Sequence, residues 1–403
     1  MPLDSRRGRW QTRTARYDGK HVSTHDGMKD EISERYAPGV TCFSGTDPDW
    51  AELVISRCGS LRTGYKPHVS VRNGHLQNLL YLVNERRTPS VSWDLEERLV
   101  MADGGTVSVQ WLGLAGAQVD SPVVLVLHTL CGSADALARQ IRSLHDGLGG
   151  LTGRSWIIAA CNRRGHGDLE LTAPVVNTMG STSDLRMQIA AISARRPDAA
   201  LYGVGVSAGS GLLVRYLGEE RESSCLRAGV ALCPAYDLRD AFDYADPLYD
   251  RYLTRKSVQF FLERNQAVLG EVDGYRECTR ASTLSEFHRL LYPLAGYPSL
   301  EDYFRNSNPM EVADDVTIPM LIVNAADDPV CSARNVYANL GRLRRLGRVT
   351  LALTRYGGHC GFFDTAFSSG SWVDRLTAEY LAAVHHELGD GRSPVSVACG
   401  GSE

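Results

Sequence analysis

The chain contains no apolar run that approaches the roughly 18 residues of a membrane span, and its first residues lack the apolar stretch of a signal peptide. Its ten cysteines are scattered singly, without a C-x-x-C pair. This spacing excludes zinc ribbons and disulfide-knotted secreted scaffolds, and we expect no metal or other cofactor. A formal net charge of only -4 provides no strong field of one sign, so nucleic acid is not an expected partner. We expect a cytoplasmic protein without a transmembrane segment.

One basic stretch lies near the start of the chain. Residues 5–16 read S-R-R-G-R-W-Q-T-R-T-A-R, and a composition rich in arginine and hydroxyl groups is also found in organelle transit segments. The neighbouring Asp4 and Asp18 count against transit, because such segments are poor in acidic residues. A solvated tail is the preferred interpretation, and organelle targeting stays open. Residues 1–90 as a whole are polar, with a short apolar piece at 79–83, which predicts a tail followed by a packed arm.

From residue 91 onward, short β-rich apolar runs alternate with helical stretches. The runs are too short for helices and too continuous for a half-exposed sheet. Buried strands linked by helices predict a mostly parallel, doubly wound α/β sheet with both faces covered. The expected strands are Val107–Leu112, Val123–Leu127, Trp156–Ala160, Leu201–Val206, Ala228–Cys233, Met320–Val323 and Val349–Leu353, and the expected helices include Asp184–Arg195, Gly209–Leu217 and Val373–Leu388.

The alternation stops between Cys233 and Met320, where 86 residues (234–319) intervene although a crossover needs far fewer. This segment holds 13 of the 32 aromatic residues, which predicts a helical cap inserted between a first core part (91–233) and a second (320–390). A disordered tail is expected at 391–403. Ligands of such sheets bind outside the carboxyl ends of the strands, so we expect the cap to cover the site and Phe260 and Phe261 to bind substrate. An extra subdomain with its own small core is the alternative.

The strongest local motif is G-x-S-x-G at Gly205 to Gly209, within L-Y-G-V-G-V-S-A-G-S-G. It stands between a predicted strand and a predicted helix, which is the context of a nucleophile elbow. The glycines fit a strained turn in which strand and helix approach closely. The motif alone is weak evidence, and the strand and helix around it favour Ser207 as a nucleophile.

A serine nucleophile needs a base and an acid, which follow it in the order Ser, Asp, His in this kind of fold. Asp328 follows one predicted strand in L-I-V-N-A-A-D-D-P-V, and His359 follows the next in Y-G-G-H-C-G-F. Loops at the carboxyl ends of neighbouring strands would bring both to Ser207. The adjacent Asp327 and the earlier Asp237 are competing acids.

Two further histidines and the oxyanion donors complete the candidate site. His128 and His166 lie in earlier loops and are interpreted as local hydrogen-bonding residues. The oxyanion of a tetrahedral intermediate needs preorganised donors, and the backbone N–H of Ala208 is expected to supply the first. The second is expected from H-T-L-C-G-S-A-D, with Leu130 preferred and Cys131 as the runner-up. The alternative is a plain turn before a helix capped by Ser133.

These motifs, together with C-N-R-R-G-H-G-D-L-E-L-T-A-P, A-D-G-G near residue 103 and Y-L-G after the elbow helix, resemble the AB hydrolase family four of the α/β-hydrolase superfamily. That family holds bacterial YheT-type esterases, membrane-anchored animal phospholipases and yeast acyltransferases that form ethyl esters. The resemblance runs from Asp94 to Leu388 and implies Ser207, Asp328 and His359 as its charge-relay triad. Thr129 stands where the family usually has glycine, and we expect no counterpart of the family's membrane-anchoring helix.

The motifs and the resemblance together predict an α/β-hydrolase fold and a serine hydrolase. Its expected substrate is a small-molecule or lipid ester with a medium-chain or lipid-like acyl group, and peripheral contact with a membrane stays open. An acyltransferase that makes esters from an acyl donor and an alcohol is one alternative, since the same residues would serve it. A ligand-binding protein that has kept the fold without catalysis is the other.

Overall fold

The computed structural model describes residues 34–389. The basic stretch at 5–16 and the predicted tail at 391–403 lie outside these residues. Within 34–389, no helix combines the length and the apolar character needed to cross a bilayer.

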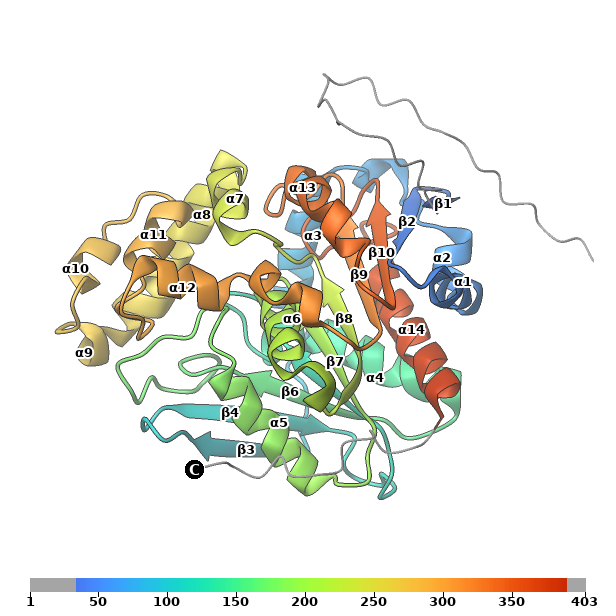
Figure 1. The fold of residues 1–403 in the computed structure, drawn as a ribbon, viewed down its shortest axis with the longest axis horizontal. Coiled ribbons are helices and arrows are strands. Elements are labelled where there is room, and N and C mark those ends of the chain that lie inside the picture. The colour runs from blue at the N-terminus through green and yellow to red at the C-terminus, as the bar shows by residue number, and fades with distance from the viewer. Residues whose placement is uncertain (1–33, 390–403) are drawn as a thin grey trace, which may run out of the picture.

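The centre of the described chain is a twisted sheet (Figure 1). Its strands are β1 (Glu34–Ala37), β2 (Val40–Ser44), β3 (Leu95–Val100), β4 (Thr106–Leu112), β5 (Val123–Leu127), β6 (Ile157–Asn162), β7 (Leu201–Val206), β8 (Leu226–Leu232), β9 (Met320–Ala325) and β10 (Val349–Thr354). They lie in the order β1-β2-β10-β9-β8-β7-β5-β6-β4-β3. Strands β6, β5, β7, β8, β9 and β10 run parallel, and two antiparallel strands extend each edge. The predicted mostly parallel sheet is confirmed.

Helices cover both faces of this sheet, as the wholly buried sequences of its parallel strands require. Alternate residues of β5 show the two layers: Val124 packs with α4 and α14 on one face, and Leu125 packs with α5 and α6 on the other. The helices around the sheet are α1 (Pro48–Arg57), α2 (Gly59–Thr63), α3 (Gly74–Arg87), α4 (Ala138–Thr152), α5 (Ser183–Arg195), α6 (Ala208–Glu220), α13 (Ala333–Leu343) and α14 (Trp372–Leu388).

Residues 34–90 are more regular than their polar sequence suggests. Strands β1 and β2 form a hairpin, and β2 pairs antiparallel with β10, so this stretch extends the sheet. These strands have four and five residues, too few for a clear period-two pattern. The polar edge strand β3, of sequence L-E-E-R-L-V, is also not predicted by the sequence pattern. Its residues are mostly half-buried or exposed, so they form no continuous apolar run.

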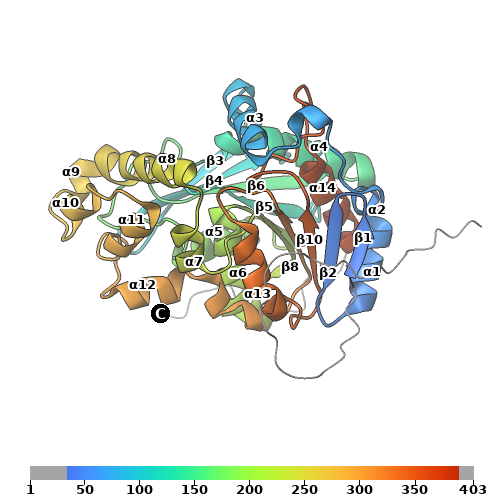
Figure 2. The ribbon, with the colours of Figure 1, turned by 90° about the horizontal axis from the view of Figure 1, so that it is seen from above.

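Residues 234–319 hold helices and no strand in the described structure. The helices are α7 (Leu238–Asp243), α8 (Pro247–Ser257), α9 (Gln266–Leu269), α10 (Tyr275–Cys278), α11 (Leu284–Leu290) and α12 (Leu300–Ser307). They gather at one side of the sheet, on the left of both ribbon views (Figures 1 and 2). Their apolar side chains form a separate core that also takes in Leu130, Leu171, Val176 and Met179 from the loops after β5 and β6. This cap therefore packs directly on the loops at the end of the sheet.

Candidate active site

Ser207 occupies a strained turn between β7 and α6. Its backbone has φ 54° and ψ −116°, a region that residues other than glycine seldom adopt. A Cβ on Gly205 would lie 2.4 Å from the Gly209 carbonyl oxygen, and one on Gly209 would lie 2.3 Å from the Leu127 carbonyl oxygen. Only glycine fits at either position, so the spacing of the motif follows from the packing of α6 against β7 and β5. The strand, turn and helix that the motif requires are present.

The structure brings Ser207, His359 and Asp328 into one hydrogen-bonded line. Asp328 lies in the turn after β9, and His359 lies in the loop after β10. The Asp328 Oδ2 is 2.8 Å from the His359 Nδ1, and the His359 Nε2 is 2.7 Å from the Ser207 Oγ. The carboxylate is almost fully buried, and its Oδ1 accepts two backbone N–H groups of its own turn at 2.8 and 3.0 Å. These bonds fix the carboxylate, and the carboxylate in turn fixes the imidazole ring.

The competing carboxylates have other partners. Asp327 Oδ1 accepts the backbone N–H of Gly358 at 2.9 Å, so this side chain joins the two loops without reaching the ring of His359. Asp237 caps the start of α7 by accepting the backbone N–H of Asp240 at 2.9 Å. Neither hydrogen-bonds to the imidazole. Of the three acids considered, Asp328 is the one that faces His359.

The local electrostatics of His359 favour its charged form. Burial lowers the pKa of the ring, but the Asp328 carboxylate and the Cys331 thiol raise it, and the net pKa lies well above 6.5. A base with a raised pKa is a stronger proton acceptor once it is neutral.

A buried arginine holds the loop that follows β5. The Arg163 guanidinium donates to the carbonyl oxygens of Thr129 at 2.6 Å and Leu130 at 3.2 Å. In a trans peptide the N–H points opposite to the C=O, so the N–H groups of Leu130 and Cys131 point away from Arg163. Both residues line the cavity above Ser207. The loop thus presents two N–H groups, either of which can serve as the second oxyanion donor beside Ala208.

His128 and His166 support the same loop, as local hydrogen-bonding residues. A ring nitrogen of His128 lies 2.9 Å from the Thr129 carbonyl oxygen, and one of His166 lies 3.0 Å from that of Leu130. Burial lowers the pKa of His166 to about 3 and that of His128 well below its ordinary value, so both rings are neutral at pH 7. Burial also lowers the pKa of Arg163, to about 10, which leaves the arginine charged.

Residues before position 90 reach the site, which the sequence did not reveal. The Asn78 Oδ1 accepts the backbone N–H of His359 at 2.6 Å. The side chain of Gln77 donates to the Phe363 carbonyl oxygen at 3.0 Å and accepts the Phe363 N–H at 2.8 Å. The hydroxyl of Tyr65 donates to the same carbonyl at 2.8 Å. We call these three side chains the N-terminal clamp, because they hold the loop that carries His359.

A largely apolar cavity opens above Ser207, with an empty volume of about 1150 Å³ that includes open solvent at its mouth. Residues of the cap and of α3 both line it. The polar side chains Glu85 and Lys256 also line it. Its apolar lining includes Tyr81, Leu82, Leu130, Met179, Leu238, Phe242, Leu253, Leu284 and Val330.

Phe260 and Phe261 are not among the residues that line this cavity. The structure therefore does not support the expectation that they contact substrate. Both lie in a π-helical turn at Val258–Leu262 that directly follows α8. Their rings pack on His166, with centroids 4.9 and 5.5 Å from it, and Phe261 is buried in the cap core. Phe242 and Leu253 stand on the cavity wall instead. Composition identified the right segment, but it could not show which of its apolar residues face inward.

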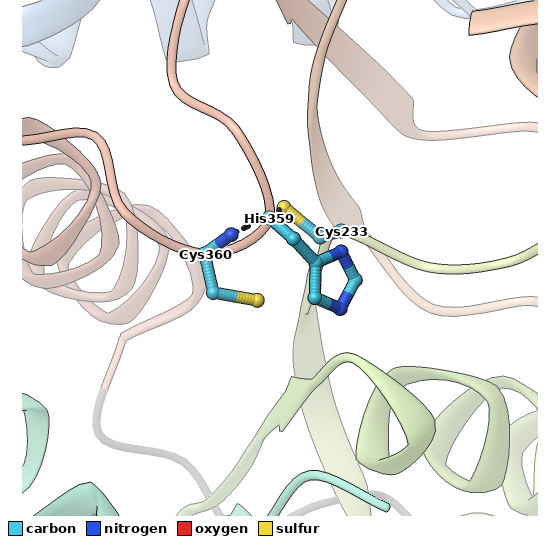
Figure 3. A group of neighbouring side chains, drawn as sticks. All are labelled: Cys233, His359 and Cys360. Carbon is cyan, nitrogen blue, oxygen red and sulfur yellow. Dashed lines mark hydrogen bonds between the residues drawn. The ribbon is translucent and has the colours of Figure 1, made fainter. Parts of the chain in front are cut away.

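Two thiols flank His359 in the structure (Figure 3). The backbone N–H of Cys360 donates to the Cys233 Sγ at 3.3 Å. The two sulfur atoms and a ring nitrogen of His359 all lie within 4.8 Å of one another. A second group within the same limit consists of Asp328, Cys331 and His359.

The strand order, the elbow and the hydrogen-bonded line after β7, β9 and β10 define the α/β-hydrolase fold. No family model matches the chain. It is 28% identical to the medium-chain fatty acid ethyl ester synthase/esterase 2 of Saccharomyces cerevisiae over 291 residues. These residues cover 66% of this chain and 62% of that relative. It is 25% identical over 364 residues to the monoacylglycerol lipase ABHD2 of Mus musculus, 84% of each chain. The curated relatives that the chain resembles are ABHD-type proteins and esterases of the α/β-hydrolase superfamily.

The chain is also similar to a solved esterase of Pyrobaculum calidifontis, with 16% identity and a TM-score of 0.46 over 78% of this chain and 92% of that one. The match to the yeast relative spans less than two thirds of that protein's length. The esterase and lipase relatives support the expectation of a carboxylic ester hydrolase.

Proposed function

We propose that this protein hydrolyses carboxylic esters, with Ser207 as the nucleophile, His359 as the base and Asp328 as the acid that orients it. The observation that carries the proposal is the line from Asp328 through His359 to Ser207, which ends at a strained elbow under an apolar cavity. A serine hydroxyl becomes a nucleophile when a base accepts its proton during attack. The 2.7 Å contact between the Ser207 Oγ and the His359 Nε2 is within the distance that this transfer needs.

The reaction follows from the roles of these groups. Ser207 attacks the ester carbonyl as His359 takes the hydroxyl proton, and the Asp328 carboxylate stabilises the imidazolium that results. The N–H groups of Ala208 and of Leu130 or Cys131 hold the oxyanion. His359 then gives its proton to the leaving alcohol, and water hydrolyses the acyl-enzyme by the same steps in reverse.

We further propose a medium-chain or lipid-like acyl ester as the substrate. The cavity above Ser207 is lined mainly by apolar side chains of the cap and of α3, and such a lining favours an alkyl chain over a polar acyl group. The names of the relatives fit this class, since one is a medium-chain ester synthase/esterase and another a monoacylglycerol lipase.

A series of p-nitrophenyl esters tests the substrate class. Each buried CH₂ contributes about 0.8 kcal/mol, close to fourfold in binding. We expect kcat/KM to rise from acetate to a maximum at roughly six to twelve carbons and to fall once the cavity is full. A profile that peaks at acetate would contradict an acyl-binding cavity. If an added alcohol gave more ester than acid, the protein would be an acyltransferase.

Two phenylalanines of the cap provide a matched pair for this measurement. Phe242 lines the cavity, whereas Phe260 packs on His166 outside it. Phe242→Ala should lengthen the cavity and move the preferred chain to more carbons, and Phe260→Ala should leave the preferred length where it is. The opposite result would show that the acyl chain lies elsewhere in the cap.

The raised pKa of His359 predicts the pH dependence of hydrolysis. The ring must be neutral to accept the Ser207 proton, so activity is lost as pH falls through its pKa. Because the net pKa lies well above 6.5, we expect kcat/KM to be low at pH 6 and still to be rising above pH 6.5. A pH–rate profile with one short-chain ester measures this. A flat profile from pH 5 to 8 would exclude a histidine base.

A further inference from the structure

Cys233, His359 and Cys360 form a compact group of soft ligand atoms. Cys233 follows β8 directly, and Cys360 is the residue after His359. Both cysteines have positive φ, 50° and 68°, a conformation that such residues adopt only where the surrounding structure enforces it. Figure 3 shows the side chains of all three residues gathered beneath the loop after β10. The cluster is thus built into the loops that carry the candidate catalytic residues.

The separation of these atoms suits a small thiophilic ion. Zinc binds cysteine sulfur at about 2.3 Å and histidine nitrogen at about 2.0 Å, in a tetrahedron. Those bond lengths put two ligand atoms roughly 3.5 to 4 Å apart. The three atoms here lie within 4.8 Å of one another, so modest side-chain movement would close the site. Two sulfurs and one imidazole favour zinc over hard cations such as magnesium.

The surroundings of the cluster favour a metal complex whose net charge is zero. Cys233 is fully buried, and Cys360 is nearly so. When two thiols bind a divalent ion, they release two protons, and the resulting pair of thiolates cancels the charge of the ion. His359 and Cys360 both line the cavity, which gives an ion a route from solvent.

We propose that Cys233, Cys360 and His359 form an inhibitory site for a thiophilic divalent ion of the zinc class. The inhibition rests on the proposed function, whereas the binding does not. Both nitrogens of His359 are in use, Nδ1 toward Asp328 and Nε2 toward Ser207. A metal bond takes the lone pair of one nitrogen and displaces the partner there. Either displacement leaves Ser207 without an oriented base.

Asp328, Cys331 and His359 form the rival set of ligands. This set offers one sulfur instead of two, so it matches a soft ion less well. Its carboxylate is also held by two backbone N–H groups, which an ion would have to compete with. The effect of substituting Cys331 on metal binding therefore shows which of the two ligand sets holds the ion.

Binding is tested first, without any dependence on hydrolysis. The probe is Co²⁺, titrated into the reduced Ser207→Ala protein, because thiolate–cobalt charge transfer reports sulfur ligation directly. We expect one Co²⁺ per chain, displaced by Zn²⁺. Cys233→Ser in the same background should weaken binding at least about tenfold, since even the loss of groups that only support metal ligands costs 10- to 100-fold. Cys360→Ser is the second test if the first variant does not fold.

Cys225→Ser is the matched control. Cys225 directly precedes β8 and Cys233 directly follows it, so the two thiols stand at opposite ends of one strand. Cys225→Ser and Cys331→Ser should leave Co²⁺ binding unchanged. Absent thiolate absorption, unchanged binding in both Cys233→Ser and Cys360→Ser, or a loss confined to Cys331→Ser would overturn the proposed site.

Inhibition is tested second, on the protein with Ser207 intact. Zn²⁺ should suppress ester hydrolysis, EDTA should restore it, and Cys233→Ser should raise the half-inhibitory Zn²⁺ concentration at least about tenfold. If Co²⁺ binds as expected but the protein hydrolyses no ester, the proposed function fails and the metal site stands. If hydrolysis is normal and Zn²⁺ neither binds nor inhibits, the metal site fails and the function stands.

Discussion

Ser207→Ala is expected to lower ester hydrolysis by roughly three to six orders of magnitude and to abolish labelling by a fluorophosphonate probe. The hydroxyl is the group that would form the acyl-enzyme, and its Oγ lies 2.7 Å from the His359 Nε2. The fold should survive, because the Ser207 side chain faces the cavity and alanine removes a single oxygen atom. Circular dichroism and a thermal melt check this while the rate is measured.

Ser210→Ala is the control for this prediction. Ser210 lies in the first turn of α6, but its Oγ is buried, and its one hydroxyl proton is shared between the carbonyl oxygens of Gly205 and Leu232, each 2.8 Å away. Its removal should cost about 1 kcal/mol of stability and leave the labelling in place. If the probe still labels Ser207→Ala at another serine, the nucleophile has been assigned to the wrong residue.

Asp328→Asn is expected to lower kcat/KM by about four orders of magnitude. The carboxylate accepts the Nδ1–H of His359 at 2.8 Å, and an amide placed there can turn its NH₂ toward the ring and favour the wrong tautomer. The substitution also removes the charge that raises the pKa of His359. The pH at which the residual activity rises should therefore be lower than in the native protein.

The adjacent carboxylate gives a stringent comparison. Asp327→Asn keeps an oxygen that can accept the Gly358 N–H and leaves the imidazole partner intact, so we expect less than a tenfold loss of kcat/KM. Asp237→Asn should retain the α7 cap, because asparagine caps a helix as well as aspartate does. A larger loss from Asp327→Asn than from Asp328→Asn would transfer the acid to position 327.

The parts of the site that could be predicted are those set by local backbone geometry and by chain order. Gly205 and Gly209 are required by contacts within a few residues of Ser207, so the motif carries its own structural explanation. The parallel strands also appear in sequence as continuous apolar runs, and their ends differ from the expected ones by at most two residues. Asp328 and His359 could be proposed because each follows such a run.

The parts that could not be predicted depend on contacts between distant segments. Arg163 holds the carbonyl oxygens of Thr129 and Leu130, more than 30 residues away, and nothing in the sequence marks that pairing. Asn78 reaches His359 across 281 positions. The choice between Phe242 and Phe260 as a cavity residue likewise depends on how the π-helical turn after α8 rotates the chain. Composition cannot report such a rotation.

The N-terminal clamp has a consequence for how this chain can be shortened. A fragment that began at residue 91 would keep every strand from β3 to β10, including the whole parallel part of the sheet. It would lose the side chains of Tyr65, Gln77 and Asn78 that hold the His359 loop, and the β2 strand that pairs with β10 just before that loop. A fragment long enough to form the parallel sheet is therefore still too short to hold His359 in place beside Ser207.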